Sequence, residues 1–174
     1  DIIEEFERTV ELDSTHIQGR IGVVNFHLVA PGIVGGDIKK AEHHANKLLI
    51  LNEVKGRIAL ANIYLKQEKM DLVETQIKIV EEKYATDKSL SQLYNSLGYY
   101  YLGINKFIEA ITAFQKQVKV NPEFANSYDS LGDGYKAAGK YSEAIAQYRK
   151  ALEINPSFSA SIKNLEELER KKGE

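Results

Sequence analysis

Residues 91–124, SQLYNSLGYYYLGINKFIEAITAFQKQVKVNPEF, decide the fold when they are set beside residues 125–158, ANSYDSLGDGYKAAGKYSEAIAQYRKALEINPSF. The two stretches are identical at 13 of 34 positions. The matches include small, aromatic and turn-forming residues at one constant offset, and that offset is the period of a helix–turn–helix repeat. The chain therefore contains an internal repeat, which predicts an all-α architecture.

The repeat resembles the tetratricopeptide repeat (TPR) family of bacterial type. That family has an aromatic residue, a Leu-Gly pair and a tyrosine on its first helix, then alanines and an aromatic residue on its second helix, and a closing proline. The second copy supplies Tyr128, Leu131-Gly132, Tyr135, Ala144, Tyr148, Ala151 and Pro156. The first copy supplies Tyr94, Leu97-Gly98, Tyr101, Ala110, Phe114 and Pro122, with Gln117 in place of a small residue. The resemblance implies a right-handed α-solenoid of stacked helix–turn–helix repeats with a C-terminal capping helix.

The pattern also has a physical reason. The apolar faces of two antiparallel helices cannot be buried by that pair alone, so the repeats must stack. We expect Gly132, with Ala144 across from it, to mark the closest approach of the two helices, while aromatic rings fill the wider gaps. Pro156 disfavours helical geometry at Asn155, and so it ends the repeat.

The whole chain is interpreted as a single TPR domain, and its parts follow from the register of the repeat. They are residues 1–15 (second helix of a partial repeat), 16–53 (a repeat with an extended turn at 30–37), 54–90 (a degenerate repeat), 91–124 and 125–158 (the two clear repeats) and 159–174 (the capping helix).

The first helix has an apolar face that no other part of its repeat covers. Ile2, Ile3, Phe6 and Val10 recur at helical spacing. We expect a longer array, or another subunit, to cover this face. Because the sequence does not begin with Met, we also expect a processed product or a piece of a longer protein.

The turn at residues 30–37 is glycine-rich and could suggest a phosphate-binding loop. It lacks the Lys-Ser/Thr pair of a P-loop, and Asp37 at the start of the following helix would repel an anion. We interpret the segment as a connector in which Pro31 stops one helix and Asp37 caps the next. A long exposed turn of this kind is also a second candidate contact site.

Composition excludes several classes of function. The formal net charge is −2 with a pI near 6.2, which gives no electrostatic case for nucleic acid. No run of about 18 apolar residues predicts a membrane span. The absence of cysteine excludes disulfides, thiolate metal sites and a cysteine nucleophile. Localisation stays open between the cytoplasm and a bacterial periplasm.

Nothing in the sequence predicts an enzyme, a cofactor or a metal. His43 and His44 diverge by about 100° on a helix, and neither has a histidine or acidic partner four residues away. No Gly-x-Ser-x-Gly motif is present, and acidic pairs such as Glu81-Glu82 fit solvated helix faces.

The resemblance implies a partner-binding face on the first helix of each repeat, which lines a concave groove. The residues expected there are Asn25, Lys55, Asn62, Lys66, Gln92, Asn95, Tyr99, Asn126, Asp129 and Asp133. Asn25, Asn62, Tyr99 and Asp133 recur one repeat apart. Asparagine amides donate and accept hydrogen bonds at once, which suits an extended peptide backbone.

The TPR sites that grip an acidic C-terminal tail need lysine, asparagine and arginine on this face. Lys55 and Asn62 are present, but Asp129 and Asp133 would repel such a tail. We therefore expect no binding of acidic tails and a preference for a neutral or basic segment.

Two interpretations of function remain. The first is a non-enzymatic protein–protein interaction scaffold that holds a protein or peptide segment in the groove. The alternative is a self-assembling or supporting module of a larger chain or complex, for example an appendage of a bacterial hydrolase. In the second case the N-terminal helix would make a homo-oligomer contact.

Overall fold

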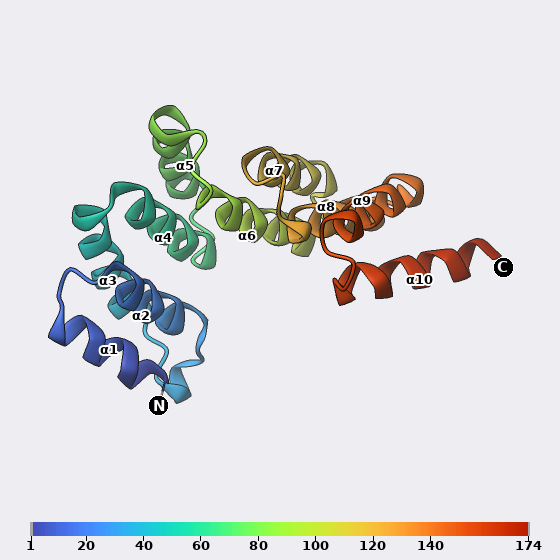
Figure 1. Cartoon of the computed structure of the whole chain (residues 1–174). Helices are drawn as coiled ribbons and strands as arrows, with labels where there is room; N and C mark the ends of the chain where they lie inside the picture. The colour runs from blue at the N-terminus through green and yellow to red at the C-terminus, as the bar shows by residue number, and fades with distance from the viewer. Residues whose placement is uncertain (1, 174) are drawn as a thin grey trace. The chain divides into compact units, whose positions relative to one another are not determined.

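The computed structural model describes residues 2–173 and the side chains of residues 2–170. Within that range the chain forms ten α-helices, one short 3-10 helix and no strand, which confirms the all-α prediction. No described helix has the length and apolar character needed to span a bilayer. In chain order the elements are α1 (Ile2–Leu12), α2 (Ile17–Val29), η1 (Gly32–Val34), α3 (Ile38–Leu51), α4 (Glu53–Lys66), α5 (Met70–Tyr84), α6 (Leu90–Gly103), α7 (Phe107–Val120), α8 (Ala125–Ala137), α9 (Tyr141–Ile154) and α10 (Ser159–Gly173) (Figure 1).

The helices fall into two compact units, Asp1–Ser89 and Leu90–Glu174. The boundary follows residues 87–89, where the sequence has about three residues more than the repeat period allows. The first unit holds α1 to α5, and the second holds the two clear repeats with α10. Each unit has a hydrophobic core of its own.

The long turn of the first unit is built as a connector. Ala30, the residue before Pro31, has extended geometry (φ −64°, ψ 137°), so α2 ends at Val29. Gly35 takes a left-handed conformation with φ 97° at the end of η1. The Asp37 carboxylate then accepts hydrogen bonds from the backbone N–H groups of the first turn of α3, as the sequence predicts.

The core of the first unit lies between α2, α3 and α4. Ala41, Ala45 and Leu48 are fully buried on α3, at the positions where the repeat pattern predicts packing. They pack against Val24 on α2 and against Leu60 and Ile63 on α4. A second helix therefore lies between the first helix of its own repeat and the first helix of the next.

α1 contacts α2, but none of its residues is buried. The ring of Phe6 lies so close to the backbone of Gly22 that a Cβ there would be 2.6 Å from the ring. Ile2 keeps 62% of its surface exposed. Among the described residues, no further helix covers the apolar face of α1.

The second unit repeats one arrangement twice. Ala110, Ile111 and Phe114 of α7 pack with Leu131 of α8. The equivalent group on α9 packs with α10, through Ala144, Ile145, Tyr148, Leu165 and Leu168. On α10, Leu165 and Leu168 are buried, but Ile162 keeps 37% of its surface exposed.

The helix spacing inside each repeat depends on a glycine against a ring. A Cβ on Gly98 would lie 2.3 Å from Phe114, and a Cβ on Gly132 would lie 2.5 Å from Tyr148. From the sequence we expected these rings to fill the wider gaps between the helices and an alanine to lie opposite the glycine. That expectation was wrong in detail, because the buried rings themselves lie against the glycines.

Replacing Gly132 with leucine is expected to destabilise the protein by about 1–3 kcal/mol. Tyr148 is fully buried and cannot move aside, so the new side chain must push α8 away from α9. Urea unfolding followed by circular dichroism measures the change. Gly103→Ala is the matched control, because nothing lies within 4 Å of a Cβ built there. Equal stability of Gly132→Leu and the wild type would contradict the close glycine–ring contact.

Candidate binding surface

Polar side chains on the first helices of the two clear repeats bond to one another. Ser130 Oγ on α8 donates to Asn95 Oδ1 on α6 across 2.7 Å. Asn126 Nδ2 lies 3.4 Å from the same Asn95 oxygen and 3.4 Å from Ser130 Oγ. Gln92, one turn before Asn95 on α6, is exposed. In the second unit, these side chains therefore form an ordered row of amides and hydroxyls.

A second group is centred on Asp133. Tyr99, one repeat earlier, donates its hydroxyl to Asp133 Oδ2 across 2.8 Å. Tyr148 on α9 donates to Asp133 Oδ1 across 2.7 Å, and Asn164 on α10 donates to the same oxygen across 3.2 Å. Burial raises the pKa of Tyr99 and of Tyr148, so both hydroxyls stay protonated as donors at neutral pH. The carboxylate is held by three neutral donors while Tyr99 keeps 40% of its surface exposed.

The prediction for Asp129 needs correction. Its side chain is 4% exposed, and it lies between α8 and α10, where Ser161 Oγ donates to Asp129 Oδ1 across 2.6 Å. Burial raises the pKa of this carboxyl group. Asp129 therefore anchors α10 and is not accessible to a partner.

The sequence patterns did not reveal the contribution of α10 to this surface. Lys136 on α8 bonds to Asn164 Oδ1 and pairs with the carboxylate of Glu167. With Ser161, these contacts place α10 beside α8 as a further first helix. Only the register predicts this, because residue 161 is one repeat beyond Ser127 and residue 167 is one repeat beyond Asp133.

Four of the predicted residues lie in the first unit. Asn25 on α2 and Lys66 at the end of α4 are exposed, while Lys55 and Asn62 on α4 are half-buried. Asn52 accepts a hydrogen bond from the backbone of Lys55, and this fixes the start of α4. The ten predicted residues thus lie in both units. The hydrogen bonds between them, Asn126 to Asn95 and Tyr99 to Asp133, lie in the second unit.

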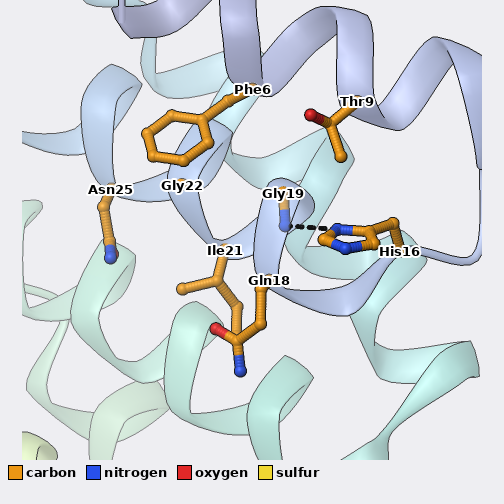
Figure 2. Close-up of a pocket in the computed structure, with 8 residues that line it drawn as sticks. All are labelled: Phe6, Thr9, His16, Gln18, Gly19, Ile21, Gly22 and Asn25. Atoms are coloured by element: carbon orange, nitrogen blue, oxygen red, sulfur yellow. Dashed lines mark hydrogen bonds between the residues drawn. The ribbon is translucent and has the colours of Figure 1, made fainter.

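Asn25 also lines a pocket of about 360 Å³ between α1 and α2. Figure 2 shows Phe6 and Thr9 of α1 on one side of this pocket and residues of α2 on the other. Its lining residues are Phe6, Thr9, His16, Gln18, Gly19, Ile21, Gly22 and Asn25. His16 Nδ1 accepts a hydrogen bond from the backbone of Gly19 and so caps α2.

His43 and His44 have different surroundings. Among the described residues, no three histidine or acidic side chains converge as metal ligands. His43 is exposed, but His44 is half-buried, and its Nδ1 lies 3.3 Å from the buried guanidinium of Arg20. One histidine of the pair is therefore solvated, and the other packs beside Arg20.

His44 should make the stability of the protein depend on pH. Burial, and then the nearby Arg20, lower the pKa of His44 to about 4 from 6.5. Because the folded protein binds this proton less tightly than the unfolded chain, the contribution is present above about pH 6.5 and is lost as the pH falls toward 4. Thermal unfolding from pH 7.5 to 4 should show a drop of the melting temperature that His44→Gln reduces. His43→Gln should leave the drop unchanged, and equal curves for the wild type and His44→Gln would contradict the assignment.

Family models identify the repeats independently. Residues 91–124 match a model described as a tetratricopeptide repeat, and residues 132–160 match a model described as a TPR repeat. None of the curated proteins matches the chain.

Three solved structures that share this fold are distant in sequence. TTC0263, a thermophilic TPR protein of Thermus thermophilus, is 16% identical, with a TM-score of 0.72 over 95% of this chain and 88% of that one. A tetratricopeptide repeat protein from Parabacteroides merdae is 17% identical, with a TM-score of 0.69 over 95% of this chain and 62% of that one. YrrB, described as a TPR protein with an unusual peptide-binding site, is 18% identical, with a TM-score of 0.55 over 92% of this chain and 79% of that one. At these identities the likeness shows the fold.

Proposed function

We propose that this chain, a tetratricopeptide repeat protein, is a non-enzymatic scaffold that binds an extended protein segment on the first helices of its repeats. Proteins built from such repeats are in general interaction modules. What we propose beyond this is the surface on which the partner segment binds. The observation that carries it is the row of partly exposed side chains on α6 and α8, Gln92, Asn95, Tyr99 and Asn126. The buried hydroxyl of Ser130 holds Asn95 and Asn126 in this row. Gln92, Asn95 and Tyr99 recur at i, i+3 and i+7, so they share one face of α6.

The chemistry of this row suits a peptide backbone. Asn95, Asn126 and Ser130 are already bonded to one another, so little side-chain freedom is lost when a ligand binds. An amide group still has further donor and acceptor capacity after one bond is made. Tyr99 adds an aromatic surface with its hydroxyl fixed on Asp133.

Charge favours a neutral or basic segment. Asp133 places a carboxyl group on this face, and its oxygens accept hydrogen bonds from neutral donors. The nearby Lys136 is paired with Glu167 and so offers little attraction to an acidic tail. Discrimination against acidic segments is expected to depend on ionic strength.

The alternative is a module that assembles with itself or supports a larger chain. Its support is α1, whose apolar face has no buried residue. A monomer seen by light scattering even at high concentration would count against self-assembly. The two proposals use different surfaces and can be tested separately.

A selection from a library of random 12-residue peptides on the wild-type protein tests the scaffold proposal. Peptides that bind should lose affinity at least tenfold on the Gln92→Ala/Asn126→Ala/Tyr99→Ala variant, because three contacts to the segment are removed. Fluorescence anisotropy measures the dissociation constants. Enriched peptides should be neutral or basic, and their binding should weaken when glutamates replace their lysines.

The control variant is Ile108→Ala on α7, whose side chain is 80% exposed. It should bind the selected peptides as tightly as the wild type, and all variants should keep their helicity. A selection that enriches no peptide, or peptides that bind the triple variant with wild-type affinity, would refute the proposed face.

A further inference from the structure

We propose that the segment bound by the second unit carries an arginine, whose guanidinium lies on the ring of Tyr99 and donates to the carboxylate of Asp133. The arginine site rests on the proposed function, because it adds one side-chain contact to the segment held on this face. Tyr99 lies on α6 and Asp133 on α8, and the hydrogen bond between them joins the two first helices. The site is therefore a single point on the face.

The register of the repeats shows which contact Asp133 lacks. On α8, Lys136 pairs with the carboxylate of Glu167 on α10. One repeat earlier, residue 167 corresponds to Asp133, and residue 136 corresponds to Leu102 on α6. An aliphatic residue thus stands where the cation for Asp133 would stand. Among the described residues, no lysine, arginine or histidine forms an ion pair with Asp133.

The carboxylate of Asp133 has room for one more donor. Its Oδ1 accepts hydrogen bonds from Tyr148 and from Asn164, across 2.7 and 3.2 Å. Within the described part of the chain, its Oδ2 accepts one hydrogen bond, from Tyr99 across 2.8 Å. A carboxylate oxygen has two acceptor sites, so Oδ2 can accept a second bond. Asp133 is partly exposed, and a ligand on this face can supply that donor.

Tyr99 provides a flat surface beside this acceptor. Its ring packs against Phe114 at an angle of 71°, with the centroids 5.2 Å apart, and its hydroxyl is held by Asp133. The side chain still keeps 40% of its surface exposed. Because the ring is fixed before a ligand binds, a cation can stack on it without further loss of side-chain freedom.

The chemistry of this pair selects arginine. A guanidinium is planar, stacks on aromatic rings and donates charge-assisted hydrogen bonds to carboxylates from its edge. One arginine can therefore lie on the Tyr99 ring while one of its N–H groups bonds to Asp133 Oδ2. A lysine ammonium is a compact point charge and covers less of the ring. A neutral amide would leave the carboxylate without a counter-charge.

The other charges of this face favour a single arginine over a run of basic residues. Asp129 is buried between α8 and α10, and Glu167 is already paired with Lys136. Lys163 and Arg170 of α10 are exposed, at the register positions of Asp129 and Lys136. A second basic residue directed toward α10 would therefore meet like charges.

The probes are the 12-residue peptides selected on the wild-type protein, which should share an arginine. Each is synthesised in three versions, with arginine, citrulline or lysine at that position. Citrulline has nearly the shape of arginine but no charge. Anisotropy titration with the whole chain should give a dissociation constant at least tenfold higher for the citrulline version and at least threefold higher for the lysine version. Both differences should shrink as the salt concentration rises.

Two protein variants locate the arginine. Asp133→Asn should weaken binding of the arginine peptide at least tenfold and leave the affinity of the citrulline peptide within threefold of its wild-type value. Leu102→Lys places a lysine where Lys136 stands relative to Glu167, and this internal cation should remove the preference for arginine in the same way. Glu153→Gln, on an exposed part of α9, makes the same charge change as Asp133→Asn and should leave the preference unchanged.

The outcomes separate the arginine site from the proposed function. Peptides that bind the face without an arginine, or equally well with citrulline, would overturn the arginine site and leave the proposed face in place. A preference for arginine that Asp133→Asn retains would also overturn it. A selection that enriches no peptide would refute both. Should Asp133→Asn weaken both peptides alike, Leu102→Lys decides, and should Leu102→Lys lose its helicity, Asp133→Asn decides.

Discussion

The contact between a glycine and a buried ring is the constraint on which the repeats of this protein depend. Gly98 lies against Phe114 and Gly132 against Tyr148, at separations that leave no room for a Cβ. The ring fills the space that a side chain on the glycine would occupy. The two helices of a repeat therefore approach closely, and the ring fixes their position along each other. The second helix then presents its remaining apolar side chains, such as Ile111 and Ile145, to the first helix of the next repeat. Stacking follows from this geometry, since the apolar face of each pair is completed by its neighbour.

The same contact positions the polar surface of the second unit. With α6 and α8 held side by side, Asn95 reaches Ser130 and Tyr99 reaches Asp133, one repeat away in sequence. The two repeats use different pairs at equivalent positions. In the earlier repeat the ring of Tyr99 packs on Phe114, with centroids 5.2 Å apart, and in the later one Asp133 accepts a hydrogen bond from Tyr148. The first copy therefore has a tyrosine and a phenylalanine, Tyr99 and Phe114, where the second copy has Asp133 and Tyr148. This exchange can be seen when the two copies are aligned.

The two ends of the described chain meet the stacking requirement differently. α10 completes the stack on α9 with Leu165 and Leu168, and it binds α8 through Ser161 and Asn164. Its outer face is polar, and Glu166 replaces the glycine that another second helix would need. α1 keeps the aromatic residue of a second helix in Phe6 and has no first helix against it among the described residues.

The sequence by itself determined the helices, their register and the family resemblance, because the glycines, alanines, rings and prolines of a repeat are local signals that recur every 34 residues. It also located the cap at Asp37, since an N-cap needs only a side-chain oxygen and the backbone N–H groups two and three residues later. Only the tertiary structure decided which polar residues are accessible. Asp129 and Asp133 stand four residues apart on one helix, yet the first is buried under α10 and the second stays half-exposed beside Tyr99. Accessibility depends on the neighbouring helix that covers each position, and that neighbour comes from about one repeat away in the chain.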